Sequence, residues 1–384
     1  MKKYTVKDIS PGVYFSKPVY LDGRFVLIAP EMPFTMETHN ILVKWGFKEI
    51  VSDGECRMDY HPEDDVTLAF EEETAETEVL TDREKIKRAE TFYNAFTEYA
   101  EALFTDVAIK GKLDFKEVVE RIKRVCDFIK ADHRFLLRVQ RVVEPKQEQN
   151  YLTSHAVKST IISLVIGYYI KLPYHRLIEL GTAALLHEIG MIKLPPQIYI
   201  NKRVLSSQEW QAIRTHPILS YNLLKSFNFP LSISVAVLEH HERENGEGYP
   251  RKLTGDKISL YAKIIAVACS YDALTTDRPH KEAKDGYTGM LDLLKNEGKQ
   301  YDDTIIRALV FSLSIYPIGL YVLLSNNKKG QVIDVNPENP RFPIVQILGE
   351  LTPDGKYKSL ETSQTGVYII RPLTREEIGP SGKG

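Results

Sequence analysis

The sequence predicts a mainly α-helical protein, with a small α/β domain before the helices and a short β appendage after them. Between residues 83 and 315, apolar residues recur at three- and four-residue steps, which is the period of an amphipathic helix. Residues 1–60 and 316–372 instead contain short apolar runs separated by turn residues, a pattern typical of strands. A chain of 384 residues is long enough for two or three domains.

Composition and charge exclude several classes of protein. A hydrophobic content of 43% and a charged content of 27% are typical of a globular protein, and a net charge of −2 gives no basic footprint for DNA. The longest apolar stretch, residues 161–170, is too short to span a bilayer, and no signal peptide is recognisable. The three cysteines are far apart without a CxxC motif, so we expect reduced thiols in a cytoplasmic protein.

The N-terminal domain, residues 1–60, is expected to combine short strands with one helix. Strands are predicted at 13–15, 18–20, 25–28 and 49–51, with a turn at Asp22-Gly23, and a helix is predicted at 35–45. Residues 61–82 contain many acids and no Lys or Arg, which indicates a solvated acidic linker.

Residues 83–145 are expected to form two amphipathic helices that connect the linker to the next domain. The first carries an apolar stripe from Ile86 to Leu103, and the second spans about 113–140. The stripe packs on the following domain by default, or it pairs with a second copy of the chain to make a homodimer. The pattern alone leaves both arrangements open.

Residues 146–315 are patterned as helices almost throughout. Helices are predicted near 151–170, 175–189, 207–215, 217–227, 231–241, 259–275, 282–296 and 302–315. In the appendage, residues 316–384, strands are predicted at 320–324, 331–335, 344–348 and 367–370. The last six residues, GPSGKG, are expected to be disordered.

Residues 240–250, HHERENGEGYP, combine two adjacent histidines with a glycine-rich turn at the end of an apolar helix. Neighbouring imidazoles can reach one polar centre at a helix end, where the backbone is free to adjust. Glycines let the loop approach a ligand without a side-chain clash. We predict a metal site covered by a ligand-binding loop. The alternative is an ordinary helix end followed by a glycine-rich stop.

Other polar residues lie at the edges of the predicted helices. His155, the pair His187-Glu188 and His216 each adjoin an apolar helix. Any one of them could be a core histidine with a hydrogen-bond partner, but five imidazoles and a carboxylate together indicate a transition metal. Arg278 and Lys281 lie just beyond another helix end, where they could hold a phosphate or simply complement the helix dipole.

Residues from about 150 to 315 resemble HD-GYP domains, a bacterial group of the HD phosphohydrolase superfamily. The resemblance rests on AALLHEIG at 183–190, the segment ending in His216-Pro217, HHERENGEGYP at 240–250 and AVACSYDALTTDRPHKEA at 266–283. The long form HHExxxGxGYP is far more specific than a lone HD pair. The first sixty residues and the β tail also look like segments that accompany this domain in some members.

The resemblance implies a helical HD-type domain that holds one or two divalent transition metals, Fe or Mn first and Zn or Ni next. It implies seven metal ligands: His155, His187, Glu188, His216, His240, His241 and Cys269. Of these, His187 and Glu188 would be the catalytic pair. The residues that would contact the ligand are Gly248, Tyr249, Pro250, Asp272, Arg278 and Lys281. The implied substrate and partner is cyclic di-GMP, hydrolysed when a metal-activated hydroxide attacks phosphorus.

Four positions depart from the family pattern. Glu188 replaces the Asp of the HD motif, Met191 replaces the following Lys, and Cys269 replaces a further Asp. Tyr151 stands where some members carry a Glu that holds a third metal, so a third ion is not expected. These changes leave an alternative open: a catalytically degenerate domain that senses cyclic di-GMP or binds a signalling protein.

The departures would affect the two metal sites unequally. One site keeps its full ligand set of His216, His240, His241 and the shared acid Glu188. The other, formed by His155, His187, Glu188 and Cys269, has lost a carboxylate. We therefore expect at least one bound metal.

Overall fold

A computed structural model gives the fold of the chain as two compact units, residues 1–79 and 80–384. The residues it describes are 2–10, 12–17, 19–20, 26–28, 34–44, 47–57, 81–142, 151–200, 203, 205–276, 283–336, 338–352 and 357–378. The acidic linker, the turn at Asp22-Gly23 and the GPSGKG tail predicted from the sequence lie outside these residues.

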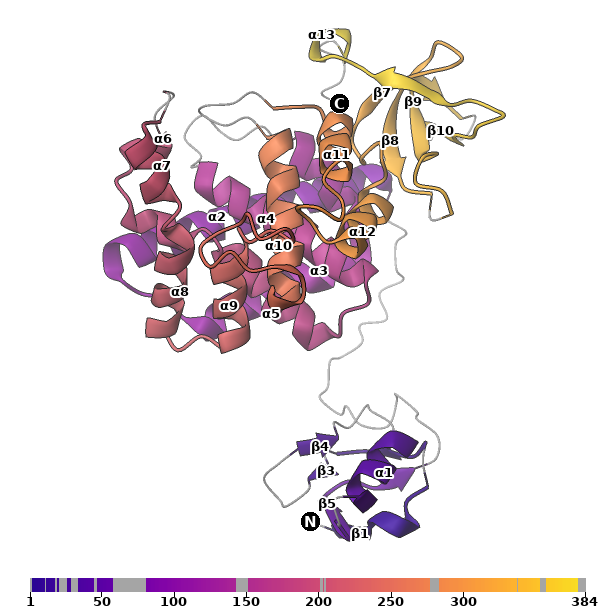
Figure 1. The fold of residues 1–384 in the computed structure, drawn as a ribbon. Coiled ribbons are helices and arrows are strands. Elements are labelled where there is room, and N and C mark those ends of the chain that lie inside the picture. Colours follow the sequence, from indigo (N-terminus) through magenta and orange to yellow (C-terminus); the bar gives the residue numbers. More distant parts are fainter. Residues whose placement is uncertain are drawn as a thin grey trace. The chain divides into compact units, whose positions relative to one another are not determined.

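The N-terminal unit is the expected small α/β domain (Figure 1). Its elements are β1 Lys2–Thr5, η1 Val6–Asp8, β2 Tyr14–Phe15, β3 Val19–Tyr20, β4 Val26–Ile28, α1 Met36–Lys44, β5 Glu49–Ser52 and β6 Cys56–Arg57. An antiparallel sheet in the order β1-β5-β3-β4 forms its centre, and Phe34, Leu42 and Ile50 are fully buried in its core. Strand β1 was not predicted, because lysines occupy two of its four positions.

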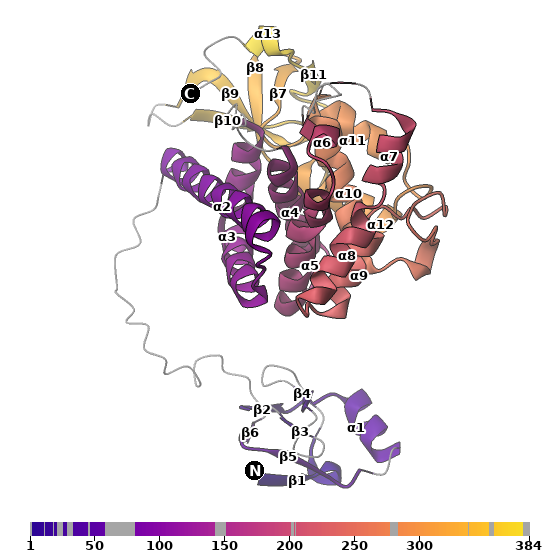
Figure 2. The same cartoon turned by 90° about the vertical axis from the view of Figure 1, so that its left-hand side faces the viewer.

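Helices dominate the second unit, which confirms the mainly α fold class (Figures 1 and 2). They are α2 Asp82–Lys110, α3 Phe115–Val142, α4 Tyr151–Tyr169, α5 Tyr174–Leu186, α6 Gln197–Ile200, α7 Ser207–Ile213, α8 His216–Ser226, α9 Leu231–Glu239, α10 Leu260–Thr275, α11 Gly286–Leu294 and α12 Asp303–Leu313, with 3-10 turns η2 Ile189–Lys193 and η3 Gly255–Lys257. No helix among the described residues is both long and apolar enough to cross a lipid bilayer.

Helix α4 is the central helix of this unit. Its residues from Leu152 to Gly167 are all buried, because α2, α3, α5, α10 and α12 pack around it. A helix covered on every side needs apolar residues all round, which explains the run at 161–166, apolar except for Ser163. Its buried residues also include the ionisable His155 and Lys158, which face the site described below.

Helix α2 packs within its own chain. Thr81 caps its first turn by accepting a hydrogen bond from the Glu84 amide, and Glu84 in turn accepts one from the Thr81 amide. The predicted apolar stripe faces α3, α4 and η2, and Tyr93 and Phe96 are buried there. The stripe therefore contributes to the core of the monomer.

A five-stranded antiparallel sheet follows the helices, in the order β10-β9-β8-β7-β11. Its strands are β7 Tyr321–Leu324, β8 Lys329–Asp334, β9 Ile344–Leu351, β10 Tyr357–Glu361 and β11 Ile369–Pro372, and the short helix α13 Arg375–Ile378 follows them. Polar pairs join the sheet to α3: Arg134 to Asp334 at 2.7 Å and Arg138 to Gln331 at 3.1 Å. The β appendage is confirmed, but the edge strand β10 was missed because it is largely exposed and lacks an apolar alternation.

Replacing Phe96 with Ala should lower the free energy of unfolding by about 3–5 kcal/mol, because a fully buried ring is removed from the core. Guanidinium denaturation followed by circular dichroism measures this change. Ile109→Ala on the same helix is the control, since that side chain is 77% exposed. A lower particle mass by light scattering, with unchanged unfolding energy, would instead place the stripe at an interface between copies.

Candidate metal centre

Three histidines of the centre lie just beyond the ends of helices. His187 follows α5, His240 follows α9, and His216 lies shortly after α7 at the start of α8. Each Nδ1–H donates to a carbonyl three residues earlier: 2.7 Å to Ala184, 2.6 Å to Ile213 and 2.7 Å to Val237, respectively. Carbonyls in the last turn of a helix have no partner within the helix, so the imidazoles satisfy them.

These hydrogen bonds determine which nitrogen of each ring carries the proton. A carbonyl oxygen can only accept, so Nδ1 is protonated and Nε2 presents a lone pair in the neutral ring. The Nε2 atoms of His216 and His240 lie 3.2 Å apart, where neither can donate to the other. Burial lowers the pKa of His240 well below its usual value, which keeps its ring neutral.

His187 gives a second indication of the same kind. Its side chain is fully buried, and its Nε2 atom has no hydrogen-bond partner among the described residues. Facing lone pairs and an unpartnered buried nitrogen are unfavourable unless a cation lies between them. The residues therefore fit a bound metal ion, and neutral imidazole suits a transition metal.

Glu188 connects the histidines into two groups. Its carboxylate lies 3.4 Å from His216 Nε2, 3.9 Å from His187 Nε2 and 4.0 Å from His155 Nε2. Burial raises the pKa of Glu188, but the surrounding histidines outweigh burial and lower it to about 2, so the group is a carboxylate. One group consists of Glu188, His216, His240 and His241, and the other of His155, His187, Glu188 and Cys269. Within each group the ligand atoms lie within 4.8 Å of one another.

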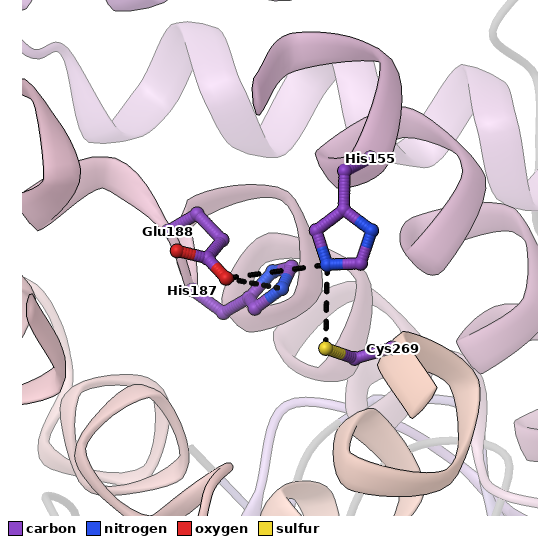
Figure 3. A group of neighbouring side chains, drawn as sticks. All are labelled: His155, His187, Glu188 and Cys269. Atoms are coloured by element: carbon purple, nitrogen blue, oxygen red, sulfur yellow. Dashed lines mark hydrogen bonds and ion pairs between the residues drawn. The ribbon is translucent and has the colours of Figure 1, made fainter. Parts of the chain in front are cut away.

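The group that contains Cys269 brings α4, α10 and the end of α5 together (Figure 3). The Cys269 sulfur lies 3.3 Å from His155 Nε2. Burial raises the pKa of Cys269, but the nearby His155 and His187 rings outweigh burial and lower it to about 5. Cys269 is therefore set up as a thiolate, the form in which sulfur binds a metal.

Asp272 is placed differently from the expected ligand contact. It is buried behind His155, whose Nδ1–H donates to it at 2.5 Å, and it also accepts from the Thr276 hydroxyl at 2.7 Å. A carboxylate on the far nitrogen of a metal-binding histidine orients the ring and raises its basicity. Asp272 thus positions His155 and has no exposed surface with which to contact a dinucleotide.

The loop after the histidine pair is held by two buried carboxylates that the sequence analysis did not single out. Glu242 accepts from the backbone amides of Arg251 at 2.6 Å and Leu253 at 2.9 Å. Glu239 accepts from the Ser259 amide at 2.8 Å and pairs with the Arg251 side chain. The sequence does contain a signal for these two residues: they flank the two histidines at the end of an apolar helix. Acids at such a place are buried and therefore need partners.

Of the three loop residues expected to face a ligand, Tyr249 has the clearest placement. Its ring stacks on His241, with centroids 4.6 Å apart and planes 19° apart. Gly248 has no room for a side chain, because a Cβ there would lie 2.4 Å from the backbone nitrogen of Arg243. Pro250 is partly buried and joins Tyr249 through a cis peptide bond. The tight packing at Gly248 holds the tyrosine over the histidine pair.

A contact between η2 and α8 brings the HD motif against His216. The Gly190 amide donates to the Ser220 hydroxyl at 2.8 Å, and that hydroxyl donates to the His187 carbonyl at 3.1 Å. A Cβ at Gly190 would lie 2.4 Å from the His216 carbonyl oxygen, so only glycine fits. The neighbouring Met191 is buried in the apolar core and supplies no cation.

The predicted phosphate-binding residues Arg278 and Lys281 lie outside the described residues. The described part of this segment ends at Thr276, whose hydroxyl donates a hydrogen bond to Asp272.

Residues 141–305 match the protein-family model described as HD domain. Over 364 residues the chain is 25% identical to the cyclic di-GMP phosphodiesterase PdeB of Borreliella burgdorferi, covering 94% of this chain and 93% of that protein. Residues 141–305 therefore form an HD domain. The HD domain is a hydrolase fold, which supports the expectation of an enzyme.

Two further proteins are similar to this chain, one in sequence and one in fold. The chain is 28% identical over 247 residues to a cyclic di-GMP phosphodiesterase of Pseudomonas aeruginosa, covering 64% of this chain and 59% of that protein. An HDG"Y"P protein from Bdellovibrio bacteriovorus superposes with a TM-score of 0.50 at 15% identity, over 80% of this chain and 97% of that one. At that identity, the likeness concerns the fold alone.

Replacing Glu242 with Ala should release the loop that carries Tyr249, because two backbone amides lose a charged acceptor worth about 1.5–3 kcal/mol per bond. Hydrogen exchange followed by mass spectrometry should show faster exchange of the Arg251 and Leu253 amides. Glu247→Ala is the control, since Glu247 is exposed on the same loop. Unchanged exchange in both variants would contradict the role given to Glu242.

Proposed function

We propose that the HD domain, which resembles those of the HD-GYP group, hydrolyses cyclic di-GMP at a centre of one or two divalent metal ions. The observation that carries the proposal is the buried carboxylate Glu188, shared by two sets of imidazole lone pairs. The named activities of the relatives from Borreliella burgdorferi and Pseudomonas aeruginosa support cyclic di-GMP as the substrate. Hydrolysis would break one P–O bond of the dinucleotide ring and add the elements of water.

Seven side chains of this chain would hold the ions. His216, His240 and His241 with Glu188 form one set, and His155, His187 and Cys269 with the same Glu188 form the other. A divalent ion held there would supply Lewis-acid chemistry and a water molecule of lowered pKa as the nucleophile. The low pKa of Glu188 keeps its carboxylate available at neutral pH without competition from a proton. His187 and Glu188, the proposed catalytic pair, are adjacent residues between the end of α5 and the start of η2.

The departures from the family pattern weaken catalysis more than they weaken metal binding. Glu188 keeps a carboxylate, and Cys269 keeps an anionic ligand, so both sets can still hold an ion. Met191 supplies no charge to a phosphate, and lost electrostatic groups of this kind cost about 2.7–4 kcal/mol in other transition states. This buried methionine is the specific observation that favours the second candidate function, a cyclic di-GMP sensor that binds without turnover.

Protein purified without oxygen should contain at least one Fe or Mn ion per chain and should convert cyclic di-GMP to linear dinucleotide or GMP. Elemental analysis gives the metal content, and chromatography of the same sample gives the product. Removing the metal with a chelator should abolish turnover, and adding Mn²⁺ back should restore it. Tight calorimetric binding without any product would instead establish the sensor. Absence of both binding and product would overturn the proposal.

Loading the metal-free protein with Co²⁺ should produce a sulfur-to-metal charge-transfer absorption band, because Cys269 offers a thiolate to one ion. Cys269→Ser should remove the band. Cys126→Ser is the matched control: Cys126 is also buried, but burial raises its pKa to about 12, so it stays a neutral thiol. A band that survives in Cys269→Ser would exclude this cysteine as a ligand.

A further inference from the structure

Arg214 lies beside the metal centre. It follows α7 directly and precedes His216 by two residues, and its side chain is exposed. Its guanidinium carbon lies over the ring of Tyr249, 4.6 Å from the centroid. Since Tyr249 stacks on His241, the cation is one aromatic ring away from a candidate metal ligand.

Tyr249 itself is packed against a candidate ligand, because its ring stacks on His241 with the centroids 4.6 Å apart. The neighbouring Gly248 packs directly against the Glu242–Arg243 backbone, which fixes the position of the Tyr249 ring. A guanidinium resting on this ring is therefore held at a defined place at the edge of the centre.

Two other cations near the centre, Lys158 and Arg243, already have hydrogen-bond partners. Lys158 is buried and donates to the Thr276 hydroxyl at 3.2 Å, beside Asp272. Arg243 donates to the Glu242 carbonyl at 2.8 Å and to the His240 carbonyl at 3.4 Å. Within the part of the chain that the structure describes, the guanidinium of Arg214 makes no hydrogen bond and no ion pair. Its donors are free to bind an anion.

We propose that Arg214 binds a phosphate of the cyclic dinucleotide. This inference rests on the proposed function of the HD domain. A guanidinium offers parallel N–H donors that match two phosphate oxygens, and that of Arg214 lies over the Tyr249 ring without a hydrogen bond to any other described residue. Because the stack already limits the motion of the side chain, binding a phosphate orders little more of it.

A purely structural role for Arg214, in which it only covers Tyr249, makes different predictions. Arg214→Leu keeps an apolar cover on the ring but removes the charge. Arg214→Lys keeps the charge but removes the planar fork. A phosphate contact predicts that leucine weakens binding strongly and lysine weakens it less, while a structural cover predicts the reverse order.

The test measures Kd, KM and kcat for cyclic di-GMP with the full-length protein loaded with Mn²⁺. Arg214→Leu should raise Kd and KM about 10-fold or more, as expected for a lost charged hydrogen bond, and Arg214→Lys should lie between leucine and wild type. Metal content and melting temperature should not change in either variant. The matched control is Arg121→Leu, since Arg121 lies over Tyr99 at 4.5 Å between α3 and α2 and contacts no residue of the centre.

Two outcomes would overturn the inference while leaving the proposed function intact: wild-type Kd and KM in Arg214→Leu, or lost binding accompanied by lost metal and a lower melting temperature. Raised KM in the Arg121→Leu control would overturn it as well, because the effect would not be specific to the site. If the wild-type protein neither binds nor hydrolyses cyclic di-GMP, the proposed function and the inference both fail.

Discussion

The hydrogen bond from an imidazole Nδ1–H to a last-turn carbonyl underlies the architecture of the centre. It is made three times, by His187, His216 and His240, at the ends of separate helical segments. Each bond satisfies a backbone group that the helix leaves unpaired and turns the Nε2 lone pair inward. Because the carbonyl ends of helices also carry partial negative charge, the same three ends favour a cation at the point where they meet. Folding and metal binding therefore depend on the same contacts.

Much of this fold could be predicted from the sequence, because its signals are local. The three- and four-residue steps indicated the helices, and HHERENGEGYP indicated the loop at 240–250. Errors arose where the determining partner is distant in sequence. The helix expected to reach residue 189 ends at Leu186, because the chain turns there into η2, where Gly190 meets Ser220. Strand β10 exists through its pairing with β9 and has little apolar pattern of its own.

The site shows the same division between local and distant signals. The residue types and their order were visible in the sequence, and the structure brings His155, His187, Glu188 and Cys269 together although they lie far apart along the chain. The role of Asp272 was not visible, because only the packing of α10 against α4 places its carboxylate on His155 Nδ1 instead of on a ligand. Glu242 was likewise hidden: an acid in a glycine-rich loop is usually solvated, and its two amide partners come 9 and 11 residues later.

The position of Glu188 between the two sets of histidines has a thermodynamic consequence. Since one carboxylate belongs to both sets, the two ion-binding equilibria share a ligand and cannot be independent. Filling one set would change the charge and orientation of the carboxylate available to the other, and by linkage the effect would be equal in both directions. Two bound ions would therefore load as a coupled pair and not independently.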